Sequence, residues 1–110
     1  MKNICLAALV SLAIIPPSVL AVSYPVDLEQ TLNGTEVLAR TETIDRDIAG
    51  LTLQNFGQQP VICTALFRNG PESPRTRRVT LEPGETRPLT AKFTREVIRL
   101  RIKLTCEEAQ

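Results

Sequence analysis

Two alternating runs, each with a cysteine on its apolar side, constrain this chain more than any other feature. The apolar positions of these runs are Val61, Cys63, Ala65 and Phe67, then Ile98, Leu100, Ile102, Leu104 and Cys106. Residues two apart lie on the same face of a β-strand. We therefore predict two strands whose cysteines both point into a common apolar core.

Residues 1–21 have the pattern of a secretory signal peptide. Lys2 is followed by an uncharged stretch, and Val19 and Ala21 stand at the −3 and −1 positions of a cleavage site. A membrane anchor is the weaker alternative, because the apolar run is about 12 residues and a span needs about 20. We expect a helical signal peptide cleaved after Ala21, a periplasmic or secreted product, and no transmembrane segment in residues 22–110.

Cleavage would remove Cys5 and leave Cys63 and Cys106 as a pair. An even number of cysteines in an exported chain indicates a disulfide. Closing a loop of about 43 residues would stabilise the fold by roughly 4 kcal/mol in the chain-entropy model. A redox or metal pair is the alternative, but the sequence has no Cys-x-x-Cys motif and no histidine. We therefore predict a Cys63–Cys106 bridge.

The remaining chain is expected to be a single all-β domain over residues 22–110. Short alternating runs are separated by turn signals every 8–12 residues or so, which is typical of an Ig-like antiparallel β-sandwich of about seven strands. Asn33-Gly34 predicts a hairpin with Leu28 opposite Ala39, and Pro83-Gly84 suits a type II turn. At most one helical turn is expected, near residues 94–96.

The sequence argues against catalysis. Without histidine there is no Ser-His or Cys-His nucleophile system. The glycines are isolated, so no nucleotide-binding loop is formed. The carboxylate pairs Asp45/Asp47 and Glu107/Glu108 are better explained as a solvated turn and a solvated tail. We expect no enzyme activity, no cofactor and no bound metal.

Charge is divided unevenly along the chain. Residues 22–60 hold six acids and two bases, whereas residues 61–110 hold ten bases and six acids. Most of the bases are arginines, which bind phosphate, sulfate or carboxylate through two parallel hydrogen bonds. A sandwich could also place the acidic half against the basic half, and that arrangement competes with a basic binding surface.

The candidate anion-binding residues form two groups, one in the loop after residue 67 and one on the last strand. They are Arg68, Arg75, Arg77 and Arg78, and then Arg99, Arg101 and Lys103. If both groups lie on one sheet, they would bind an anionic polysaccharide, a lipid headgroup or an acidic envelope protein. The alternative is a solvated face paired with neighbouring acids. Nucleic acid is not expected, because no aromatic residue is interleaved with the arginines.

A second hypothesis is an interaction partner in an envelope assembly. A small exported sandwich has edge strands, and an edge strand can pair with a strand of another protein. The sequence does not indicate which edge would be open.

Several segments resemble a family of small uncharacterised secreted proteins of Gram-negative bacteria. The similar segments are Tyr24-Pro25-Val26, Leu32-Asn33-Gly34, residues 67–75, Arg77-Arg78-Val79-Thr80-Leu81, Pro83-Gly84-Glu85 and residues 98–106. The resemblance implies export and a β fold. Some members carry a phosphoglycerate kinase name, which would make the chain an enzyme. That kinase is a much longer two-domain α/β protein, so the residues do not support this third hypothesis.

Overall fold

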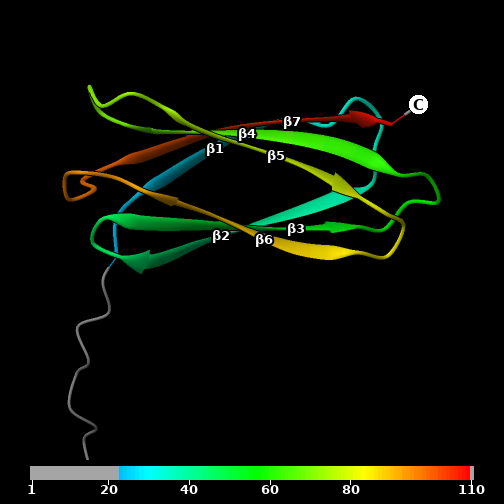
Figure 1. Cartoon of the computed structure of the whole chain (residues 1–110), viewed down its shortest axis with the longest axis horizontal. Helices are drawn as coiled ribbons and strands as arrows, with labels where there is room; N and C mark the ends of the chain where they lie inside the picture. Colours follow the sequence, from blue (N-terminus) through cyan, green and yellow to red (C-terminus); the bar gives the residue numbers. More distant parts are fainter. Residues whose placement is uncertain (1–22, 110) are drawn as a thin grey trace, which may run out of the picture.

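The computed structural model describes residues 23–109, which form seven strands (Figure 1). The strands are β1 (Val26–Thr31), β2 (Val37–Asp45), β3 (Ile48–Asn55), β4 (Val61–Asn69), β5 (Arg75–Leu81), β6 (Thr86–Lys92) and β7 (Leu100–Glu108). The predicted signal peptide, its cleavage after Ala21 and Cys5 lie outside the described residues. Within residues 23–109 no helix is long and apolar enough to cross a membrane. Residues 94–96, where the sequence allowed at most one helical turn, form no helix.

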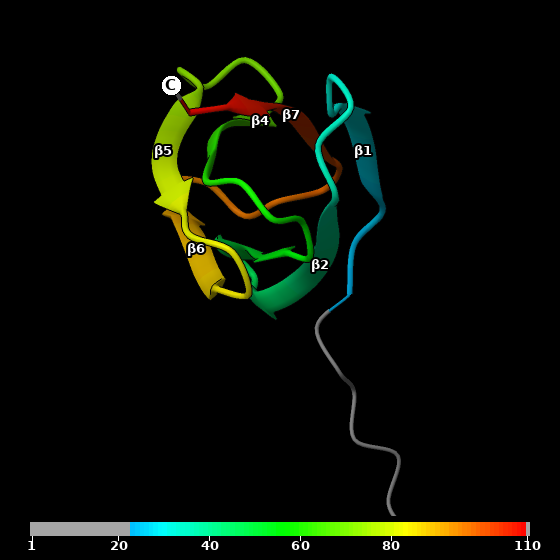
Figure 2. The same cartoon turned by 90° about the vertical axis from the view of Figure 1, so that its right-hand side faces the viewer.

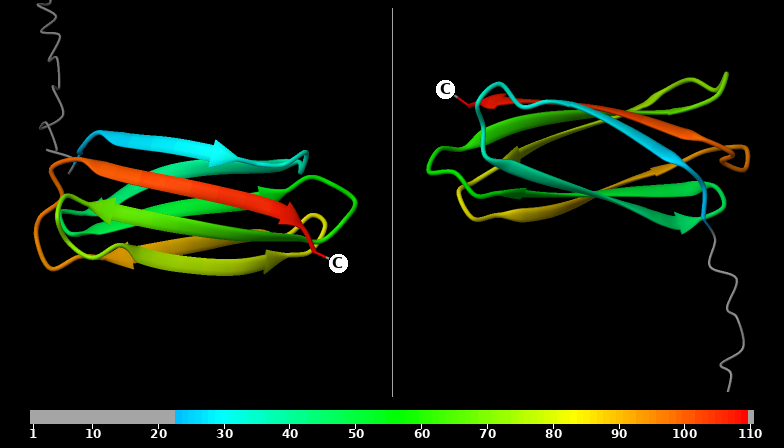
Figure 3. Two further views of the ribbon diagram at one scale, coloured as in Figure 1. Left: turned by 90° about the horizontal axis from the view of Figure 1, so that it is seen from above. Right: turned by 180° about the vertical axis from the view of Figure 1, so that it is seen from behind.

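The strands form two packed sheets, which confirms the predicted all-β sandwich. One sheet has the order β1-β7-β4-β5 and the other β2-β3-β6. Figures 1 and 3 show the two layers from the side and from above. Immunoglobulin domains also divide their strands four and three, but they pair the sixth strand with the seventh. Here β6 and β7 lie in different sheets, so the likeness is one of architecture and not of strand order.

The core is built by the alternation seen in the sequence. The inward positions of β4 and β7 are fully buried, from Val61 to Phe67 and from Leu100 to Cys106. They face Leu51 and Leu53 of β3, which are buried as well. Burying a side chain such as that of Phe67 contributes about 1.5–3 kcal/mol. The apolar alternation of these strands is therefore what holds the two sheets together.

The predicted disulfide is present between Cys63 and Cys106, with 4.1 Å between their Cα atoms. The two residues are direct partners in the antiparallel pairing of β4 with β7. The bridge consequently joins neighbouring strands of one sheet and does not cross between the sheets. Both cysteines are inaccessible to solvent, as the apolar surroundings of each in the sequence predicted.

The predicted first hairpin is wrong. Asn33 and Gly34 do form a turn with positive φ angles of 50° and 79°, and the Thr35 N–H donates to the Leu32 carbonyl at 2.9 Å. However, Leu28 pairs with Ile102 of β7 in parallel, and Ala39 pairs with Leu53 of β3. The turn therefore carries the chain from one sheet to the other. The turn signal is local, whereas the strand partner is decided by which apolar faces cover each other.

The start of the last strand also differs from the prediction. Ile98 was expected on the buried face, yet it is 82% exposed, and Val97 is buried in its place. The Val97 N–H donates to the Arg46 carbonyl at 2.7 Å, which draws residue 97 towards the turn between β2 and β3. Pairing of β7 begins only at Leu100, so strand alternation does not hold for residues 97–99.

Candidate anion-binding face

Four of the predicted basic residues lie on the outer face of the four-stranded sheet. Strand alternation places Arg101 and Lys103 of β7 opposite in direction to the buried Leu100, Ile102 and Leu104, and both are exposed. Arg68 of β4 and Arg78 of β5 are exposed for the same reason. The two groups of bases therefore share one sheet, which is the condition for a common binding surface.

Arg68 and Arg101 are direct partners across the β4–β7 pairing. Like charges placed directly opposite each other destabilise a sheet. Among residues 23–109 neither guanidinium forms an ion pair. Two arginines that face water side by side, with no acid bound to either guanidinium among the described residues, are suited to hold an anion between them.

The acids of β1 compensate part of this charge. Asp27 is the register partner of Arg101, and Glu29 is the register partner of Lys103. The Asp27 carboxylate is bound to Arg99, however, at 2.9 Å from both Nε and Nη2. The alternative of a solvated face paired with neighbouring acids is thus realised for Arg99 and not for Arg68 or Arg101.

Two open depressions meet at the Arg68–Arg101 pair. One, of about 270 Å³, is lined by Arg68, Gly70, Arg99 and Arg101. The other, of about 440 Å³, adds Lys103 together with the acids of β1. Gly70, which lines the smaller depression, has a φ of 55°. No atom lies within 4 Å of the position that a Cβ would occupy, so the space beside this glycine is open. We call Arg68, Arg99, Arg101 and Lys103 the basic face.

Arg75 and Arg77 do not belong to the basic face, contrary to the proposed grouping of the seven bases. Both lie in β5 on the same side as the buried Val79, so they point towards the other sheet. Arg75 Nε donates to the Lys92 carbonyl at 3.1 Å, and Arg77 Nε donates to the Thr90 carbonyl at 3.0 Å. Figure 2 shows β5 and β6 next to each other on one side of the sandwich, and these two hydrogen bonds connect the two strands there.

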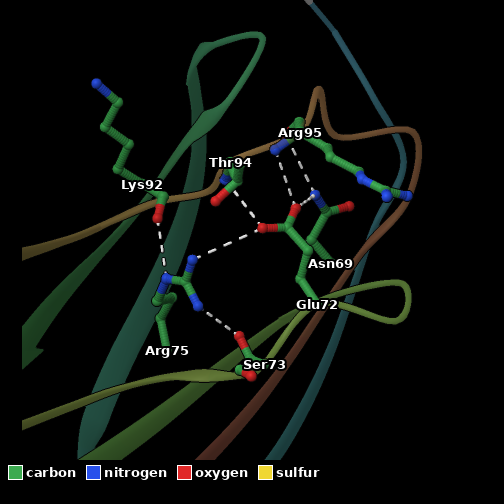
Figure 4. Close-up of polar contacts among 7 residues, drawn as sticks. All are labelled: Asn69, Glu72, Ser73, Arg75, Lys92, Thr94 and Arg95. Carbon is green, nitrogen blue, oxygen red and sulfur yellow. Dashed lines mark hydrogen bonds and ion pairs between the residues drawn. The ribbon is translucent and has the colours of Figure 1, made fainter.

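Glu72 organises the end of the sandwich beside Arg75 (Figure 4). Its carboxylate accepts hydrogen bonds from the backbone N–H groups of Thr94 and Arg95, at 2.9 and 3.1 Å, and from Asn69 Nδ2 at 2.8 Å. Arg75 Nη2 lies 3.6 Å from the same group. Backbone hydrogen bonding, with that of Thr94 first, lowers the pKa of Glu72. The sequence did not single out Glu72, because it lies in a loop without periodicity.

Each nitrogen of the Arg75 guanidinium therefore has a polar partner within the protein. Nη1 donates to the Ser73 carbonyl at 2.6 Å, and the guanidinium lies over the ring of Phe93, 5.5 Å from its centre. A cation in this position also gains from the charge distribution of the ring. Arg75 thus ties the loop before β5 to the segment after β6 and holds the two sheets in position.

No protein-family model matches the sequence, and a search of curated proteins finds no match. Among the described residues no group of three or more histidine, cysteine, aspartate or glutamate side chains is placed to hold a metal ion. The basic face therefore has to be interpreted from its own chemistry.

Proposed function

We propose that this protein is a non-catalytic exported binding module whose basic face holds a phosphate- or sulfate-bearing ligand of the cell envelope. The observation that carries the proposal is the side-by-side pair Arg68 and Arg101, which has no acid bound to it and which opens onto two depressions. A tetrahedral oxyanion between the two guanidiniums would remove their mutual repulsion and accept paired hydrogen bonds from both.

The exported protein would meet this ligand in an oxidising compartment outside the cytoplasm. The proposal combines the signal peptide predicted in residues 1–21 with the buried Cys63–Cys106 bridge. Disulfides of this kind persist in oxidising compartments such as the bacterial periplasm. We infer that the ligand is a polysaccharide or lipid headgroup of that compartment that carries phosphate or sulfate.

The surrounding chemistry supports a binding role for the face. Lys103 lines the larger depression beside the pair, and Leu66 supplies an apolar wall. Arg99 lines the smaller depression but remains bound to Asp27. We infer that Arg68 and Arg101 make the main contacts and that Lys103 extends them along the strand. Arg78 lies on the outer face of the same sheet, on the edge strand β5, and is therefore at the periphery of the proposed binding site.

The test is retention on immobilised heparin and on lipopolysaccharide, with elution by a salt gradient. Arg68→Ser with Arg101→Ser should elute at clearly lower salt than the wild type, because screened electrostatic contacts are lost. The matched control is Arg46→Ser with Lys92→Ser, which removes two exposed charges elsewhere and should elute like the wild type. Equal elution of both variants, or no retention of the wild type on either matrix, would reject the proposal.

A further inference from the structure

Ile98 carries the most exposed of the large apolar side chains in residues 23–109. It is 82% exposed, whereas the other exposed ones are 48% to 54% exposed. A single apolar side chain at a surface needs no explanation by itself. This one, however, is fixed by its neighbours. Val97 is buried and its N–H donates to the Arg46 carbonyl at 2.7 Å, and the Leu100 N–H donates to the Pro25 carbonyl at 3.0 Å. The segment is anchored on both sides of Ile98, so the side chain is held in water.

The Arg68–Arg101 pair lies at the same end of the sandwich as Ile98. Arg68 is the penultimate residue of β4, and Arg101 is the second residue of β7. Ile98 lies two residues before β7 begins. Figure 3 shows the loop after β4 and the segment before β7 together at one end of the molecule. The proposed anion site and the exposed apolar side chain are therefore neighbours.

A third open depression connects the two. It has a volume of about 230 Å³, and Ile98 and Pro71 provide its apolar wall. Gly70 and Arg99 line this depression and also the smaller depression of the basic face. A ligand that reaches the arginines from this end would consequently meet a basic surface and an apolar surface side by side.

The acids near Ile98 are mostly neutralised within the protein. The Glu72 carboxylate accepts hydrogen bonds from backbone N–H groups and lies 3.6 Å from Arg75 Nη2. The Asp27 carboxylate is bound to Arg99.

The charges that form no ion pair are mainly positive at this end. Among residues 23–109, the exposed side chains of Arg68, Arg95 and Arg101 have no acidic partner. Glu96, which lines the third depression, forms no ion pair either. The surface around Ile98 is therefore basic as well as apolar.

We propose that this end of the sandwich docks on a membrane surface of anionic phospholipid, with Ile98 inserted below the headgroups and Arg68 and Arg101 bound to lipid phosphates. The inference rests on the proposed function and names lipid as the source of the anion. Peripheral proteins bind bilayers by burying apolar side chains at the headgroup boundary while basic residues attract the anionic lipids. A polysaccharide has no apolar phase and would leave Ile98 in water.

The experiment is co-sedimentation of the exported, oxidised protein with phosphatidylcholine vesicles, with and without phosphatidylglycerol. Wild type should bind only the vesicles that contain phosphatidylglycerol. Ile98→Ser should fold normally, because the side chain is exposed, and should bind these vesicles about fivefold more weakly. The matched control is Leu38→Ser, which removes an exposed apolar side chain from the other sheet and should bind like wild type.

A fluorescent reporter measures the insertion itself. The sequence contains no tryptophan, so Ile98→Trp introduces a single indole at the proposed point of contact. Its emission should shift to shorter wavelength on phosphatidylglycerol vesicles, and brominated acyl chains should quench it. Leu38→Trp should show neither effect, because its indole would remain in water.

Retention on heparin separates this inference from the proposed function. Ile98→Ser should elute from heparin like wild type while it binds vesicles more weakly. If wild type is retained on heparin through Arg68 and Arg101 but does not bind the vesicles, the membrane inference is overturned and the proposed function stands. The inference is also overturned if Ile98→Ser and Leu38→Ser bind vesicles equally, or if vesicles leave the emission of Ile98→Trp unchanged. If Arg68→Ser with Arg101→Ser binds both heparin and vesicles like wild type, both proposals fail.

Discussion

The guanidinium of Arg77 in β5 donates to the carbonyl oxygen of Thr90 in β6, at 3.0 Å, although the two strands belong to different sheets. Arg75 makes the equivalent bond to Lys92. Edge strands expose unpaired backbone groups that can recruit other chains. Arg75 and Arg77 cover the exposed backbone carbonyls of the edge strand β6. They also connect the two sheets at a place where β5 and β6 form no backbone hydrogen-bond ladder.

Replacing Arg77 by methionine keeps the length of the side chain and removes the donor. We expect the free energy of unfolding to fall by about 0.5–1.5 kcal/mol, which is the net value of a single hydrogen bond. Arg78→Met is the matched control, because Arg78 lies on the outer face without a hydrogen-bond partner among residues 23–109, and it should change stability little. Urea denaturation measures both. Equal stability of the two variants would show that the Arg77 contact is not structural.

Glu72 should make stability depend on pH. Hydrogen bonds lower its pKa in the folded state below the usual 4.5, so its contribution is complete above that value and is lost as pH falls through the folded-state pKa. Wild type should therefore be more stable than Glu72→Gln at about pH 7, and the difference should shrink at about pH 3. Thermal unfolding across this range is the measurement.

A control separates Glu72 from the general effect of acid. Glu107 is an exposed glutamate on β7 whose carboxylate accepts no hydrogen bond among the described residues, and Glu107→Gln, measured at the same two pH values, shows the effect of removing one surface carboxylate. If the difference for Glu72→Gln changes with pH no more than that for Glu107→Gln, the Glu72 carboxylate gains nothing from the backbone of Thr94 and Arg95.

The Cys63–Cys106 bridge should supply a large part of the stability. Its loop of 43 residues corresponds to roughly 4 kcal/mol in the chain-entropy model. Cys63→Ala with Cys106→Ala should lose about this amount, and so should wild type under strong reductant. Guanidinium denaturation with and without reductant measures it. If reductant leaves the wild-type midpoint unchanged, the bridge contributes nothing to stability.

Asn55 is a buried polar side chain that joins the two sheets. Its Nδ2 donates to the carbonyls of Gln59 and Leu81, at 2.8 and 3.2 Å, and its Oδ1 accepts from the Gly57 N–H. Asn55→Ala would leave these groups without partners, so we expect a loss of roughly 2–3 kcal/mol. Gln54→Ala, on the outer face, should cost much less. Comparable losses for the two variants in urea denaturation would contradict this account.

Much of the fold could be predicted because burial follows strand alternation. The inward positions from Val61 to Phe67 and from Leu100 to Cys106 are predicted by period two alone, and the cysteine pairing follows from them. The partner of β1 could not be predicted. The Asn33-Gly34 turn is encoded locally, whereas the pairing of Leu28 with Ile102 depends on residues more than seventy positions away.

The candidate site was predictable in part. Arg101 and Lys103 alternate with buried residues, so their outward direction follows from the sequence. Arg75 and Arg77 share the inward side of Val79, and that spacing was a signal that they would turn away from the outer face. The role of Glu72 left no such signal, because a loop carboxylate takes its partners from a segment more than twenty residues later.

The most direct test of the account is a double-mutant cycle of Arg68 and Arg101 on affinity for a sulfated heparin oligosaccharide. Wild type, Arg68→Ser, Arg101→Ser and the double variant are compared by calorimetric titration at constant ionic strength. If both guanidiniums hold one anion, each substitution should weaken binding and the two effects should be non-additive. Affinities that are unchanged, or that fall by strictly additive amounts, would contradict a shared anion site between these two residues.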